Sequence, residues 1–132
     1  MARPPRDPAA SAGLSIRITG FAMIAGVMAF AAISIAVAPE PGPAAPPQGF
    51  VWGLAALALL LLVGGLALGR GGERKRILPL ALCEGCGLNG SVLTLLTGNP
   101  AWAAALGGLA IAALILGLAG DGGPTPGLGR SA

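Results

Sequence analysis

Four apolar runs, each about twenty residues long, decide what this chain can fold into. At about 1.5 Å of rise per residue, a helix of that length crosses the roughly 30 Å hydrocarbon core of a bilayer. Only 10% of the 132 residues are charged, compared with about 25% in average soluble domains. The sequence therefore predicts an all-α integral membrane protein, a bundle of four transmembrane helices at residues 18–38, 50–69, 77–97 and 101–120.

The segments that join these runs read as turns, loops and tails. Residues 39–49 carry five prolines, which excludes a helix because proline lacks the N–H donor and clashes in a helix interior. Residues 97–100 read Thr-Gly-Asn-Pro, a turn that makes the last two spans an antiparallel hairpin. We expect residues 1–17 and 121–132 to be disordered tails, the first of them basic.

The basic residues give the predicted orientation. They gather in the N-terminal tail, in the turn at residues 70–76 and at Arg130, which four spans place on one side of the membrane. The positive-inside rule makes that side cytoplasmic, so both termini face the cytoplasm of a multi-pass cell-membrane protein of the bacterial inner-membrane type. The turn itself is interpreted as a topology determinant or, alternatively, as a contact for anionic lipid or a partner, through Arg70, Arg74, Lys75 and Arg76.

A cleaved signal peptide is the rival interpretation of the first run. Ala36-Val37-Ala38, just before Pro39, fits a signal-peptidase site, and cleavage there would leave three spans. The run is longer than a typical signal-peptide core of about 7–15 residues. It also carries small residues at helical spacing, Ala22 with Gly26 and Ala25 with Ala29, which favour close helix packing in lipid.

The third run holds the chemistry-bearing side chains of the hydrophobic segments. Glu84 is the one carboxylate within any span, and ionisable groups at membrane depth are rare and usually functional. Because lipid cannot solvate its charge, we expect Glu84 to hold a proton much of the time. The sequence therefore predicts a proton-handling group of Glu84, Asn89 and Ser91, or, alternatively, a protonated Glu84 that hydrogen-bonds a neighbouring helix. Gly85, Gly87 and Gly90 invite close packing of another helix.

Cys83 and Cys86 form a C-x-x-C pair on the same helix. Two thiols could bind a thiophilic metal or cycle between dithiol and disulfide. A structural zinc site needs four ligands, and this chain has no histidine and no further cysteine. The alternative is that both cysteines are small apolar residues at a packing face.

Residues Leu80 to Leu96, LALCEGCGLNGSVLTLL, resemble the carboxylate-bearing helix of rotary ATPase proteolipid (c) subunits. Glu84 stands at the position of the ion-carrying carboxylate and Gly90 at the glycine six residues later. The resemblance implies that Glu84 carries an ion, although the carboxylate here falls on the third of four spans. It describes a remote, c-like membrane module and not a working ring subunit.

The cysteine pair and the size of the chain resemble small transporters of mercury and other thiophilic metals. The resemblance implies a metal permease that uses Cys83 and Cys86. Taken together, the sequence predicts a non-enzymatic membrane scaffold or accessory subunit that needs no cofactor, with this permease as the alternative. Its expected partners are the lipid bilayer and a homo-oligomer or larger membrane complex, with no nucleic acid.

Overall fold

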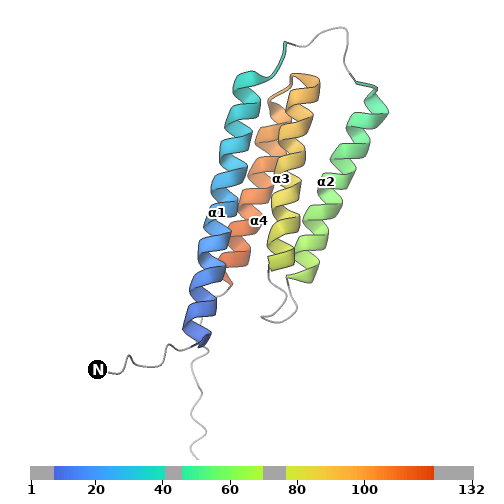
Figure 1. Ribbon diagram of the computed structural model, residues 1–132. Coiled ribbons are helices and arrows are strands. Elements are labelled where there is room, and N and C mark those ends of the chain that lie inside the picture. The colour runs from blue at the N-terminus through green and yellow to red at the C-terminus, as the bar shows by residue number, and fades with distance from the viewer. Residues whose placement is uncertain (1–7, 41–45, 70–76, 121–132) are drawn as a thin grey trace, which may run out of the picture.

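The computed structural model describes residues 8–40, 46–69 and 77–120, which form long helices and no strand (Figure 1). The chain runs up and down through the bundle, so that consecutive helices are antiparallel. The all-α prediction is confirmed. The helices are α1 (Pro8–Val37), α2 (Gln48–Leu68), α3 (Ile77–Thr97) and α4 (Ala101–Ala119).

Helix α1 differs most from its predicted bounds. It begins at Pro8, ten residues before the expected start, so residues 8–17 are helical and not part of a disordered tail. Proline is tolerated at the first position of a helix, where its missing N–H has no helical acceptor, and the alanine-rich sequence that follows has high helix propensity. Residues 1–7 and 121–132, the rest of the predicted tails, lie outside the described residues.

All four helices are long and apolar enough to cross a membrane. Many of their largest apolar side chains point outward, among them Phe21, Leu60 and Leu116, each at least 66% exposed. Such an apolar circumference would be costly in water but is what hydrocarbon solvates. The chain is therefore a multi-pass membrane protein.

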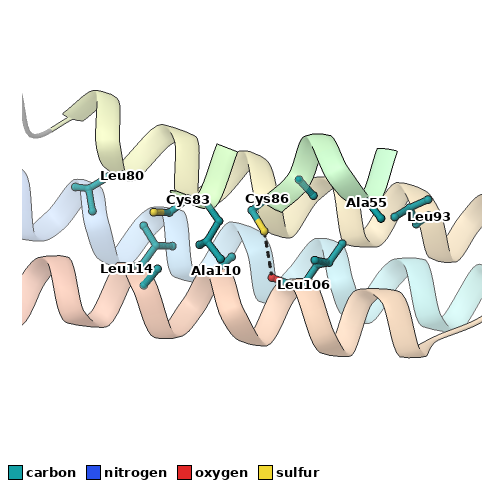
Figure 2. Close-up of a cluster of buried hydrophobic side chains, with 11 residues drawn as sticks. Ala55, Leu80, Cys83, Cys86, Leu93, Leu106, Ala110 and Leu114 are labelled. Atoms are coloured by element: carbon teal, nitrogen blue, oxygen red, sulfur yellow. Dashed lines mark hydrogen bonds between the residues drawn. The ribbon is translucent and has the colours of Figure 1, made fainter. Parts of the chain in front are cut away.

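Helix α3 is the centre of the bundle. It packs against all three other helices, while α1 and α2 flank the α3–α4 pair. Figure 2 shows the resulting core, in which Cys83, Cys86 and Leu93 of α3 meet Leu106 and Leu114 of α4. Nine residues of α3 are buried, compared with six of α4 and four of α2. The hydroxyl groups of Ser91 and Thr94 on α3 are thus buried within the protein, whereas Glu84 and Asn89 are half-buried.

The turn between α3 and α4 is held by side chains from both of its ends. Thr94, which is fully buried, accepts a hydrogen bond from the Ala103 N–H (2.9 Å) and donates one to the Asn99 carbonyl (3.2 Å). Gly98 has a φ of 68°, a left-handed conformation that glycine adopts without steric cost. Pro100 already has helical dihedral angles, so Asn99 is the true N-cap, and its side chain accepts from the Ala101 N–H (3.0 Å).

The two ends of the bundle are distinct. The N-terminal ends of α2 and α4 lie together, where Trp52 and Trp102 pack edge to face with ring centroids 6.0 Å apart. Tryptophan is enriched at the membrane–water interface, which agrees with an interfacial position for this end. The first turn of α1, the end of α2, the start of α3 and the end of α4 lie at the opposite end (Figure 1). These are the ends that border the three segments predicted to be cytoplasmic.

Candidate functional site

Glu84 lies on α3, on the side that faces α1. A Cβ atom built at Gly26 of α1 would lie 3.6 Å from Oε1 of Glu84, an ordinary van der Waals contact. The residue is half-buried, and within the described part of the chain no side chain or backbone group hydrogen-bonds or ion-pairs with its carboxyl group. Glu84 is therefore placed by packing against Gly26 and not by a polar partner.

The depth of Glu84 follows from its position in α3. It is seven residues from Ile77 and thirteen from Thr97, which corresponds to about 10 Å and about 20 Å along the helix. A hydrocarbon core of roughly 30 Å would therefore enclose the carboxyl group. Since no polar partner lies beside it, a charge on this group would be unpaired in lipid.

Asn89 and Ser91, the other two members of the predicted proton-handling group, bond within their own helix. The Asn89 amide donates to the Gly85 carbonyl (3.0 Å), and the Ser91 hydroxyl donates to the Gly87 carbonyl (3.4 Å). Five residues of helix turn Asn89 about 140° away from Glu84. The three side chains thus form no hydrogen-bonded relay with one another.

Cys83 and Cys86 are both free and buried, and their thiols face different helices. The Cys86 thiol donates to the Leu106 carbonyl of α4, with sulfur and oxygen 3.8 Å apart (Figure 2). The Cys83 sulfur instead lies against Gly65 of α2, where an added Cβ would approach it to 2.8 Å. Among the described residues no group of three metal-ligating side chains occurs. The thiols are thus built into two packing interfaces, as expected of small apolar residues.

The three glycines predicted to mediate packing differ in how closely they are approached. A Cβ at Gly90 would lie 2.7 Å from the Leu106 Cβ and 2.8 Å from the Trp102 carbonyl, and one at Gly87 would lie 2.7 Å from Val27. At Gly85 the nearest atom, from Leu61, is 3.4 Å away. Gly87 and Gly90 therefore allow α1 and α4 to approach α3, while Gly85 meets α2 with ordinary contact distances.

The basic turn and the neighbour of Glu84 are the remaining features to compare with the sequence predictions. Arg70, Arg74, Lys75 and Arg76 lie outside the described residues. Gly26, which the sequence marked solely as part of a packing ridge, is the residue beside Glu84, and no periodicity within one helix could have paired the two.

A cavity of about 210 Å³ opens among the helix ends near Ile16, Pro79 and Leu118. The described residues that line it include no charged or polar side chain.

The described site thus consists of one unpaired carboxyl group, two buried thiols and polar side chains that bond to backbone carbonyl groups. Comparison with known proteins adds no relative to this description: no protein-family model matches the chain, nor does any curated protein or solved structure. A function for this membrane protein therefore has to follow from its own residues.

Proposed function

We propose that this chain is a non-enzymatic membrane scaffold or accessory subunit whose third helix presents Glu84 within the bilayer as a contact and proton-handling group. One contrast carries the proposal. The other α3 side chains that bear nitrogen or oxygen each donate a hydrogen bond to a backbone carbonyl: Asn89, Ser91, Thr94 and Thr97. Glu84 has no such bond to any residue that the structure describes.

A buried polar group without a partner is destabilising, so a chain that satisfies its hydroxyl and amide groups but leaves its carboxyl group free is unusual. A structural role for Glu84 would call for a hydrogen bond to a neighbouring helix. The residue beside the carboxyl group is instead Gly26, which is exposed, and Glu84 itself is half-buried, so we expect a lipid-soluble reagent to reach it. The c-subunit-like sequence around Glu84 agrees with a role in carrying a proton.

The thiophilic-metal permease has less support. Such a permease would need both thiols on one path, whereas Cys86 is bonded to the Leu106 carbonyl and Cys83 lies against Gly65. We therefore keep the scaffold as the proposed function.

Labelling with a hydrophobic carbodiimide tests the proposal. The reagent modifies protonated carboxyl groups that it can reach from lipid, and mass spectrometry of the protein in liposomes locates the adduct. We expect an adduct on Glu84 and none on Glu40, an exposed residue outside the helices that serves as the matched control. Loss of labelling as the pH rises would support proton exchange. Absence of an adduct on Glu84 at every pH would refute a reachable carboxyl group and the proposed role.

A further inference from the structure

The surface next to Glu84 carries small residues that the bundle leaves uncovered. Ala22, Gly26 and Ala29 follow one another at i, i+4 and i+7 on α1, so they share a helix face. All three are exposed, although their spacing predicts close packing against another helix. With Glu84 of α3, which lies beside Gly26, they form what we call the Glu84 face.

An ionised Glu84 would carry a charge that no described residue at the same depth balances. A carboxylate in lipid is stabilised by an opposite charge that comes within a few ångströms, and the described residues provide none. The sequence carries no lysine or arginine from residue 18 to residue 69 or from residue 77 to residue 120. Any cation that pairs with Glu84 at this depth must therefore come from another molecule.

A second copy of this chain does not fit that requirement. Arg17, the basic residue nearest in α1, is nine residues from Gly26, or about 13 Å along the helix. A parallel two-fold dimer through this face would bring Glu84 close to its own counterpart, which places like groups together. Charge complementarity thus selects a different protein as the occupant.

We infer that the Glu84 face docks a transmembrane helix of a partner protein that carries one lysine or arginine at the depth of Glu84. The small residues on α1 let the partner's backbone come close, and the ion pair fixes its depth and register. The inference rests on the proposed function, because it names the chemistry of the partner that the accessory subunit would bind.

Energy transfer in liposomes tests the inference. The full chain carries a donor dye on its C-terminal tail, and the probe is a synthetic leucine/alanine helix of about 22 residues, long enough to span. The probe has a single lysine at the depth of Glu84, and the matched peptide has leucine there. We expect the lysine peptide to bind about tenfold more tightly, which corresponds to about 1.4 kcal/mol. A peptide with its lysine near one end should bind like the leucine peptide.

Four variants show whether this preference arises at the Glu84 face. Glu84→Gln should remove the preference for lysine and Gly26→Leu should weaken binding of the lysine peptide. Glu40→Gln and Gly53→Leu are the matched controls, since Glu40 is exposed outside the helices and a side chain at Gly53 meets open space. Both controls should bind like the unaltered chain, and the helical circular dichroism of all four should be unchanged.

Three results would overturn the inference: equal binding of the lysine and leucine peptides, a lysine preference that survives in Glu84→Gln, or energy transfer between two labelled copies that Gly26→Leu abolishes. The last result would make a second copy the occupant. Carbodiimide labelling of Glu84 separates the two proposals. An adduct without a lysine preference refutes the basic partner and leaves the proposed function standing, whereas absence of the adduct refutes the proposed function itself.

Discussion

At Gly90 the backbone of α3 lies so close to α4 that no room remains for a side chain. Alanine there would place its Cβ 2.7 Å from the Leu106 Cβ and 2.8 Å from the Trp102 carbonyl, a backbone atom that cannot rotate away. We therefore expect Gly90→Ala to destabilise the protein by about 1–3 kcal/mol, the usual range for overpacking a core. Unfolding in mixed micelles, followed by tryptophan fluorescence, measures this loss. Gly108→Ala is the control because a Cβ at Gly108 meets nothing within 4 Å, and equal stability of the two variants would contradict the prediction.

Single residues also show which features of the candidate site could be predicted from the sequence and which could not. The depth of Glu84 in a span could be read from its distance along α3, because helical rise is fixed. Its neighbour could not, since Gly26 comes from a helix 58 positions earlier and the pairing depends on how the helices assemble. The hydrogen bond of Asn89 has a local cause: its amide donates to the Gly85 carbonyl, one turn back in its own helix.

At the scale of whole elements, the bounds of the helices could be predicted well, but which face of each helix packs against a neighbour could not. The bounds of α2, α3 and α4 fall within two residues of the predicted runs, because apolar length and turn residues both marked them. The small-residue pairs were less informative about packing inside the bundle. A Cβ at Gly49 or Gly53 of α2 would meet nothing within 4 Å, whereas one at Gly65 would lie 2.8 Å from atoms of α3. The spacing of small residues says that a helix can be approached, but not whether a partner in the same chain does so.

The contact between α2 and α3 at Gly65 gives an element-scale prediction. A side chain at Gly65 would collide with the Cys83 sulfur and the Pro79 carbonyl, both 2.8 Å from the added Cβ. Gly65→Leu should therefore push α2 off α3 and expose Cys83, while Cys86 stays covered by α4. Labelling with a membrane-permeant maleimide, mapped by mass spectrometry, should show a several-fold faster reaction at Cys83 alone.

Gly53→Leu is the control for that experiment because it adds the same side chain to α2 in open space. It should leave both thiols as slow as in the unaltered chain. If Cys86 instead reacted in step with Cys83, the two thiols would share one interface, and the assignment of Cys83 to α2 and Cys86 to α4 would be wrong.

On the scale of the whole molecule, the bundle depends on α1 as well as on the α3–α4 pair. Val27 of α1 is fully buried and lies where a Cβ at Gly87 of α3 would be, close to Ala110 of α4. Gly20 of α1 likewise meets the Leu118 side chain of α4. Loss of the first helix would uncover these α3 and α4 surfaces, and for this reason we expect all four spans to be retained.

Retention of α1 can be tested together with the sidedness of the membrane. We expect the 132-residue chain, purified from membranes after expression, to keep residues 1–38, so that its intact mass corresponds to 12.8 kDa. Four spans return the C-terminus to the side of the N-terminus, and the positive-inside rule predicts that this side is cytoplasmic. Green fluorescent protein fused to the C-terminus should therefore fluoresce, while alkaline phosphatase fused there should be inactive. A mass that lacks the first 38 residues would show that α1 is removed and that three spans remain. The C-terminus would stay on the same side in that case, because α1 delivers residue 39 to the far side of the membrane before cleavage. Active phosphatase would therefore contradict the predicted orientation and not the retention of α1.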